Sequence, residues 1–99
     1  MNDSTKERDI ERLLVKTVKN AGGIAPKFVS PGLDGVPDRI VLLPEGRIAF
    51  VELKAPGRKP RPLQIRRMKQ ISALGFPVYC IDSTEQIEKI LMEIGGDAR

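Results

Sequence analysis

The stretch DRIVLLPEGRIAFVELK, which occupies residues 38–54, decides the fold of this 99-residue chain. Residues 39–43 and 47–54 are rich in the branched and aromatic side chains that favour β-strands. The turn formers at residues 44–46 make a short connection, which predicts an antiparallel hairpin. The second strand is apolar on both faces, which is typical of a central strand that is covered on both sides.

Further helices and strands are expected before and after this hairpin. Residues 5–20 predict an amphipathic helix that opens with the capping-box pattern Ser4-Thr5-Lys6-Glu7. The remaining elements are expected as strands at residues 24–30 and 77–81, a helix from Pro62 to about Leu74, and a helix over residues 83–94 with Ser83 and Gln86 as its capping pair. The order α-β-β-β-α-β-α over residues 1–99 indicates one domain of the α/β (mixed α+β) class, a mixed sheet flanked by helices.

The charge of the chain is concentrated in one segment. The formal net charge is +4 and the pI is about 9.5. Residues 53–81 contain no Asp or Glu, and their cations are Lys54, Arg58, Lys59, Arg61, Arg66, Arg67 and Lys69. A segment of one sign attracts polyanions such as nucleic acid, although a solvated helix face would have the same composition.

The composition excludes several kinds of chemistry. The chain has no His and one Cys, so neither a zinc site nor an intramolecular disulfide is expected, and the usual general base of Ser and Cys hydrolases is missing. A metal here would be a hard cation held by carboxylates. Cys80 follows an apolar run and is expected to behave as a small hydrophobic residue. No apolar run reaches membrane-spanning length and the N-terminus is too polar for a signal peptide, so a cytoplasmic protein without a membrane partner is expected.

Three charged residues at the ends of the hairpin strands form the candidate site. Residues two apart in a strand share a face, so Glu52 and Lys54 stand side by side at the end of the most apolar strand. Asp38 begins the first strand, and the hairpin brings it opposite Glu52. Two carboxylates that converge beside an ammonium group suit Mg²⁺ or Mn²⁺. The competing interpretations are a surface ion pair for Glu52 and Lys54 and a turn aspartate for Asp38.

Two polar residues lie at apolar helix faces. Glu11 projects ~60° from Leu14, on the flank of the first helix's apolar face. Glu7 projects there too, but the capping box accounts for it. Gln64 falls at the centre of the arc formed by the apolar residues of segment 63–74, a face that we expect to be buried. A buried glutamine needs hydrogen-bond partners, which an active centre or the backbone would supply, and Glu11 is alternatively an ordinary helix-flank glutamate.

At this point the motifs resemble a known family. Gly35-Val36-Pro37-Asp38-Arg39, followed by Phe50-Val51-Glu52-Leu53-Lys54-Ala55-Pro56-Gly57, resembles the PD-(D/E)xK nuclease superfamily. Within it, the chain is similar to stand-alone VRR-NUC domains of phages and prophages, which continue with a proline-flanked basic loop and a helix opened by Gln, as residues 58–64 do here. The similarity runs from the first helix to about Ser83.

The resemblance implies a restriction-endonuclease-like core with a mixed four-stranded sheet flanked by helices. It implies that Asp38 and Glu52 ligate Mg²⁺ or Mn²⁺, with the Leu53 backbone carbonyl as a further ligand, and that Lys54 positions or deprotonates the attacking water. Glu11 lines up with the first-helix glutamate of archaeal Holliday-junction resolvases, which makes it a candidate catalytic residue and metal ligand, and Gln64 matches the family's helix glutamine. The expected contacts to DNA are Lys27, Ser30, Arg58, Lys59, Arg61, Arg66 and Lys69.

The function expected from residues and resemblance together is metal-dependent, structure-selective endonuclease activity in DNA repair. The scarcity of aromatic residues argues against a base-stacking platform and favours recognition of duplex shape, as in a Holliday junction. The small size of the domain and the two-fold symmetry of such a substrate favour a homodimer in the cytoplasm of the bacterial host, with no nucleotide cofactor. The alternatives are a non-catalytic basic nucleic-acid-binding module and a nuclease subunit of a larger replication or repair complex.

Overall fold

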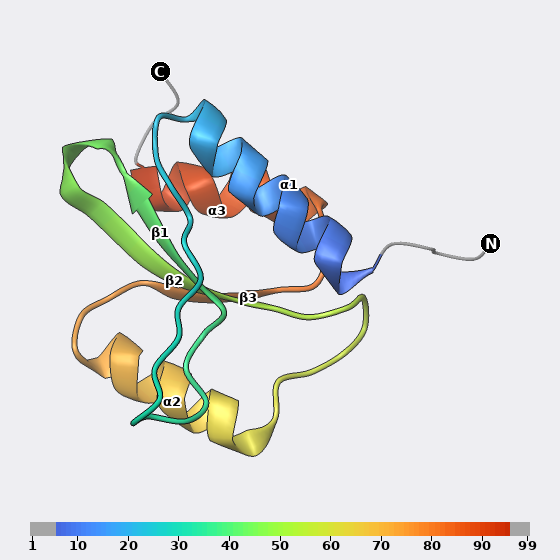
Figure 1. Cartoon of the computed structure of the whole chain (residues 1–99), viewed down its shortest axis with the longest axis vertical. Helices are drawn as coiled ribbons and strands as arrows, with labels where there is room; N and C mark the ends of the chain where they lie inside the picture. The colour runs from blue at the N-terminus through green and yellow to red at the C-terminus, as the bar shows by residue number, and fades with distance from the viewer. Residues whose placement is uncertain (1–5, 96–99) are drawn as a thin grey trace.

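The computed structural model describes residues 6–95 as a three-stranded mixed sheet with two helices on one face and one on the other (Figure 1). The elements are α1 (Glu7–Asn20), β1 (Arg39–Leu43), the 3₁₀ turn η1 (Pro44–Gly46), β2 (Arg47–Leu53), α2 (Pro62–Ala73), β3 (Val78–Ile81) and α3 (Glu85–Gly95). None of the helices within this part of the chain combines the length and the hydropathy that a membrane crossing requires.

The sheet confirms the predicted hairpin and the central place of its second strand. The strand order is β1-β2-β3. β1 and β2 are antiparallel, with Arg39 opposite Val51. β2 and β3 are parallel, with Glu52 opposite Cys80, and α2 makes the crossover between them. Cys80 is exposed, so its predicted role as a packed hydrophobic residue is wrong: it lies on an edge strand of the described sheet.

The predicted strand at residues 24–30 is absent from the described sheet, which therefore has three strands rather than four. The segment runs antiparallel to β1 and makes only isolated bridges, from Ile24 to Leu42 and from Lys27 to Arg39. Pro26 explains the interruption. Its carbonyl accepts the Ile40 N–H at 3.0 Å, but a proline has no N–H to return the second bond of that pair. The described order is α-β-β-α-β-α.

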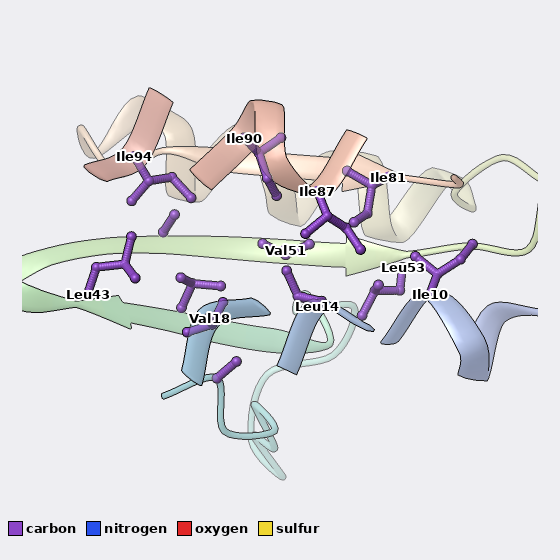
Figure 2. Packing of buried hydrophobic residues seen from close by; sticks show 13 residues of the cluster. Ile10, Leu14, Val18, Leu43, Val51, Leu53, Ile81, Ile87, Ile90 and Ile94 are labelled. Carbon is purple, nitrogen blue, oxygen red and sulfur yellow. The ribbon is translucent and has the colours of Figure 1, made fainter. Parts of the chain in front are cut away.

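The hydrophobic core lies between the sheet and the two helices α1 and α3 (Figure 2). The central strand contributes Ala49, Val51 and Leu53, alternate residues that point to this face and are almost completely buried. Around them pack Ile10, Leu14 and Val18 of α1 and Ile87, Ile90 and Ile94 of α3. The other face of β2 therefore presents the intervening residues, Glu52 among them, to the side of α2.

α2 does not have the buried face that its sequence predicts. None of its residues is buried, and Leu74, directly after it, is 72% exposed. α2 contacts the sheet chiefly through the four-residue edge strand β3, so much of the apolar surface around the helix stays accessible to solvent. Elsewhere, the Phe50 ring of β2 lies 5.6 Å from Phe28 and 5.9 Å from Phe76 between centroids.

The helix starts differ in how well they were predicted. In α3, the Ser83 N–H donates to Gln86 Oε1 at 3.1 Å, which confirms the predicted capping pair. In α1, the Lys6 N–H donates to Asp9 Oδ2 at 3.0 Å, so Asp9 and not Glu7 closes the first described turn. The predicted cap at Ser4 and Thr5 lies outside the described residues.

Candidate active site

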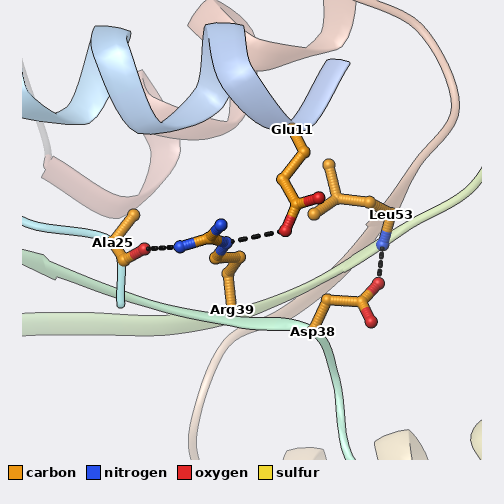
Figure 3. A network of polar contacts seen from close by, with 5 residues as sticks. All are labelled: Glu11, Ala25, Asp38, Arg39 and Leu53. Carbon is orange, nitrogen blue, oxygen red and sulfur yellow. Dashed lines mark hydrogen bonds and ion pairs between the residues drawn. The ribbon is translucent and has the colours of Figure 1, made fainter. Parts of the chain in front are cut away.

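Asp38 and Glu52 meet at the open end of the hairpin, as the sequence predicts. Arg39 pairs with Val51, so Asp38 and Glu52 occupy the next positions outward on neighbouring strands. Asp38 Oδ2 accepts the Leu53 N–H at 2.9 Å (Figure 3). This bond takes the place of a further backbone hydrogen bond between the strands, and it holds the Asp38 carboxylate against the end of β2.

Glu52 is the one buried charged residue in the described part of the chain, with 1% of its surface exposed. Its Oε2 accepts a hydrogen bond from Gln64 Nε2 at 2.8 Å and lies 3.2 Å from Lys54 Nζ. The two side chains of the ion pair are 2% and 16% exposed, so the interpretation as a surface ion pair is wrong. A buried pair of this kind is costly unless its remaining polar atoms are satisfied, which makes it a functional candidate.

Gln64 is held in one orientation by two hydrogen bonds. Its Oε1 accepts the Arg61 N–H at 2.8 Å, and this caps the first turn of α2. Because the amide oxygen is occupied in this way, the Nε2 group points to Glu52. Both proposed partners of this glutamine, the backbone and the active centre, are therefore present.

The surroundings of Asp38 and Glu52 are unfavourable to a negative charge on both carboxylates. Burial raises the pKa of Glu52 above its ordinary value of 4.5, and the charge of Asp38 raises it further. Lys54 lowers the pKa of Glu52 but does not offset the other effects. Two carboxylates beside one ammonium group leave an excess negative charge, which a divalent cation would neutralise.

The donor set fits a magnesium-type cation. Mg²⁺ is commonly held by one or two carboxylates together with water and substrate phosphate. The hydrogen bonds described above use Oδ2 of Asp38 and Oε2 of Glu52, so the second oxygen of each carboxylate is left as a ligand. Within residues 6–95 no three or more His, Cys, Asp or Glu side chains form a larger metal-binding cluster. The geometry therefore suits a two-carboxylate site.

Glu11 has a different partner. Its Oε2 lies 2.9 Å from Arg39 Nε, and Arg39 Nη1 donates to the Ala25 carbonyl at 2.8 Å (Figure 3). Arg39 thus ties α1 to the segment that precedes β1. Glu11 lies close to the Asp38 end of the hairpin, but the contact in the structure is an ion pair with Arg39.

Glu7 is the residue that sequence reasoning missed. It lines a cavity together with Lys54, and its charge also raises the pKa of Glu52. The sequence held a signal for it, because Glu7 lies one helical turn before Glu11 on the same flank of the helix. The capping box predicted with Ser4 accounts for Glu7 in the sequence, and in the described structure Asp9 closes the first turn.

The predicted DNA-contact residues separate into three groups. Arg58, Lys59 and Arg61 are exposed and line the cavity beside Lys54. The exposed side chains of Arg66 and Lys69 are on α2. Lys27 and Ser30 belong to the segment beside β1, where the Phe28 N–H donates to the Asp38 carbonyl at 2.9 Å, so the backbone of this segment runs next to the candidate site.

Comparisons with known proteins identify chains that are similar to this one. The chain is 55% identical over 80 residues to a protein named "Putative nuclease p44" from Acyrthosiphon pisum secondary endosymbiont phage 1, covering 81% of this chain and 86% of that protein. It is similar to a solved structure described as a VRR_NUC domain, with a TM-score of 0.81, 34% sequence identity, and coverage of 91% of this chain and 97% of that one. A scan against protein-family models found no match.

The phage relative and the VRR_NUC structure place this mixed α/β domain in the nuclease class. The chain belongs to the VRR-NUC family, in the form that phages encode.

Proposed function

We propose that this chain is an Mg²⁺- or Mn²⁺-dependent endodeoxyribonuclease that hydrolyses phosphodiester bonds in branched DNA such as a Holliday junction. The observation that carries the proposal is the burial of Glu52 beside Asp38, with Lys54 and Gln64 both bonded to the same oxygen of Glu52. A structural ion pair has no use for the second carboxylate, which makes the charge balance worse.

Asp38 and Glu52 would hold the cation through their second oxygens, with the Leu53 carbonyl as a further ligand. A bound divalent cation supplies Lewis acidity and lowers the pKa of a bound water. Gln64 fixes the rotation of the Glu52 carboxylate, so the oxygen that faces the cation stays in place. Glu11 contributes either directly as a ligand or through Arg39, which its carboxylate holds.

Lys54 would act on the water and on the phosphate. Its ammonium group lies 3.2 Å from Glu52 Oε2 and keeps N–H donors for a phosphoryl oxygen. The water oxygen forms a bond to phosphorus, and the bond from phosphorus to the 3′ oxygen breaks. The proton of the water passes to solvent, and the 3′ oxygen takes up a proton from solvent, which leaves a 5′-phosphate and a 3′-hydroxyl. Charge that develops on the phosphoryl oxygens is stabilised by Lys54.

The basic surface would hold the DNA backbone by charge and give affinity without reading bases. Arg58, Lys59 and Arg61 extend from the loop after β2, and Arg66 and Lys69 extend from α2. The segment of Lys27 and Ser30 would approach the same strand from the side of β1.

A homodimer would give a four-way junction two symmetric sites. The surface around α2 supports a second copy of the chain as the partner, because apolar side chains are accessible there on a domain too small to bury them itself. The exposed members are Leu63, Ile65, Leu74 and Phe76.

Cleavage of a panel of substrates tests the proposed function. Linear duplex, flap and four-way-junction DNA are incubated with Mg²⁺ or Mn²⁺ and with the wild-type protein, Glu52→Ala or Lys89→Ala. Lys89→Ala is the matched control, since it removes an exposed charge on α3. We expect the wild type and the control to cut the junction in preference to linear DNA, and Glu52→Ala to cut none.

Cleavage that survives in Glu52→Ala would overturn the proposed site. DNA binding by the wild type without cleavage of any substrate would favour the non-catalytic module. Preferred cleavage of the flap would make flap DNA the substrate and would leave the proposed hydrolysis unchanged.

A further inference from the structure

A separate cavity of about 330 Å³ adjoins Lys54. The described residues that line it are Glu7, Lys54, Ala55, Arg58, Lys59 and Arg61. Neither Asp38 nor Glu52 is among them, so the cavity adjoins the candidate metal site without containing it. Lys54 belongs to both places, with its ammonium on Glu52 and its side chain in the wall of the cavity.

The wall of the cavity is strongly basic. It presents four cationic side chains against one carboxylate, that of Glu7. In the described structure none of the three loop cations, Arg58, Lys59 and Arg61, forms an ion pair with an acidic side chain. Cations gathered without protein partners create a positive potential that attracts an anion.

The loop that carries these cations is shaped before any ligand binds. The Arg58 N–H donates to the Ala55 carbonyl at 2.9 Å, and Gly57, with φ +80°, allows this tight turn. The Gly57 N–H donates to Asp82 Oδ2 at 3.2 Å, which ties the loop to the end of β3. At its far end Pro62 starts α2. A preformed site costs less ordering entropy on binding than a flexible basic tail.

We propose that this cavity binds a phosphodiester group of the cut strand immediately next to the scissile phosphate. The inference rests on the proposed function and deepens it, because it makes the enzyme dependent on a strand that continues beyond the cut. Because Lys54 contributes to both places, a phosphate in the cavity would lie beside the scissile phosphate along the strand. The size of the cavity accommodates a phosphodiester group with part of its sugar.

Glu7 weakens this subsite. Its carboxylate faces the same cavity as the cations, and a phosphate that enters is repelled by it. The repulsion lowers the affinity for the product strand, which must leave after cleavage. Glu7→Gln is therefore expected to tighten DNA binding about threefold, whereas removal of a metal ligand would abolish cleavage.

Single methylphosphonate substitutions test the subsite. A junction is prepared with one neutral methylphosphonate at each phosphate flanking the cut, and kcat/KM and the dissociation constant are measured. The proteins are the wild type, Arg58→Ala, Lys59→Ala and, as the matched lysine control, Lys89→Ala. In the wild type and the control, neutralising one of the two flanking phosphates lowers kcat/KM about tenfold, the effect of one charged hydrogen bond. In Arg58→Ala and Lys59→Ala the same substitution changes kcat/KM less than about threefold.

Equal losses in the wild type and in both loop variants would overturn the subsite, as would no loss at either flanking phosphate. Both results leave cleavage intact and so leave the proposed function standing. Absence of cleavage by the wild type would overturn the proposed function instead. In that case the dissociation constants still test the cavity. A loss of DNA affinity on methylphosphonate substitution that disappears in Arg58→Ala supports the subsite, and a loss that persists in this variant contradicts it.

Discussion

At the scale of single residues, one oxygen of Glu52 joins the site together, because Gln64 Nε2 donates to it at 2.8 Å and Lys54 Nζ lies 3.2 Å from it. Strand alternation and a short hairpin connection are enough to bring Asp38, Glu52 and Lys54 together, and the register confirms it. The bond from the Leu53 N–H to Asp38 and the double role of Gln64 depend on where a loop and a helix settle in space. No periodicity in the sequence encodes those positions.

Glu52→Gln separates activity from stability. A carboxyl group whose pKa is raised by folding binds its proton more tightly in the folded state, so Glu52 lowers stability as the pH rises from 4.5 through its folded pKa. Without divalent cations, Glu52→Gln is therefore expected to be more stable than the wild type at neutral pH. The difference shrinks as the pH approaches 4.5. Cleavage falls at least about 100-fold.

Urea unfolding at several pH values, with chelator present, checks the stability part of this prediction. A wild type that is the more stable protein at neutral pH would show that Lys54 stabilises the ionised Glu52 by more than burial and Asp38 destabilise it.

Gln64→Ala removes the donor to Glu52 and the cap of α2 in one step. We expect a loss of about 1–3 kcal/mol in the free energy of unfolding. We also expect kcat/KM to fall about 10- to 100-fold, as is typical when a residue that orients a metal ligand is removed. Gln70→Ala is the matched control on the same helix, because Gln70 is exposed and bonded only to Arg67 among the described residues. It is expected to stay within about 0.5 kcal/mol of the wild type.

Thermal unfolding and cleavage kinetics of these two variants provide the measurement. If Gln64→Ala were destabilised with unchanged kcat/KM and pH profile, Gln64 would only cap the helix, and its bond to Glu52 would have no part in positioning.

At the scale of elements, two expectations from local pattern fail, each for its own reason. Residues 24–30 run beside β1, but Pro26 has no N–H to complete the hydrogen bonds of a strand. The apolar arc of α2 predicts a buried face, yet none of its residues is buried, because the helix contacts chiefly the short edge strand β3. The predicted bounds of α1, α3 and the hairpin, whose apolar faces are buried by their neighbours, agree closely with the structure.

Arg39 is expected to stabilise the fold by holding three segments together. It pairs with Glu11 of α1 and donates to the Ala25 carbonyl, with 15% of its side chain exposed. Arg39→Ala should cost about 2 kcal/mol, because it leaves a half-buried carboxylate and a carbonyl without this donor. Arg12→Ala removes an exposed arginine from the same helix as Glu11 and should cost less than about 0.5 kcal/mol.

A double-mutant cycle of Arg39→Ala and Glu11→Gln, followed by thermal unfolding, measures the coupling of the pair. Coupling of about 1 kcal/mol is expected for a partly buried, hydrogen-bonded ion pair. If the two changes in the free energy of unfolding were additive, the ion pair of Arg39 and Glu11 would not contribute to stability. A change in Mg²⁺ requirement in Glu11→Gln, without loss of stability, would assign Glu11 to the metal.

At the scale of the whole molecule, the two faces of the sheet have different roles. α1 and α3 bury the core on one face (Figure 1). The other face carries Glu52 and the helix α2, none of whose residues is buried. The sequence predicts the layered α/β class because the hairpin and the amphipathic helices are local patterns. Association of two chains is not a local pattern, so the homodimer remains a proposal.

Leu74→Asp tests the homodimer. Leu74 is 72% exposed at the end of α2, so a charge there should leave the folded monomer intact and oppose any contact that covers it. We expect sedimentation to show a dimer for the wild type and a monomer for Leu74→Asp, while Met92→Asp, which changes another exposed apolar residue on α3, stays dimeric. A wild type that sediments as a monomer would contradict the proposed homodimer with two symmetric sites. A Leu74→Asp variant that remains a dimer would show that the interface does not include the surface around Leu74.

The central claim is that Asp38 and Glu52 jointly hold a divalent cation, and calorimetric titration of the apo protein with Mn²⁺ tests it most directly. Asp38→Asn and Glu52→Gln should each weaken Mn²⁺ binding at least about tenfold. Glu45→Gln, at the exposed hairpin turn on the opposite end of the strands, should bind like the wild type. Mn²⁺ affinity that is unchanged in Glu52→Gln would contradict the account.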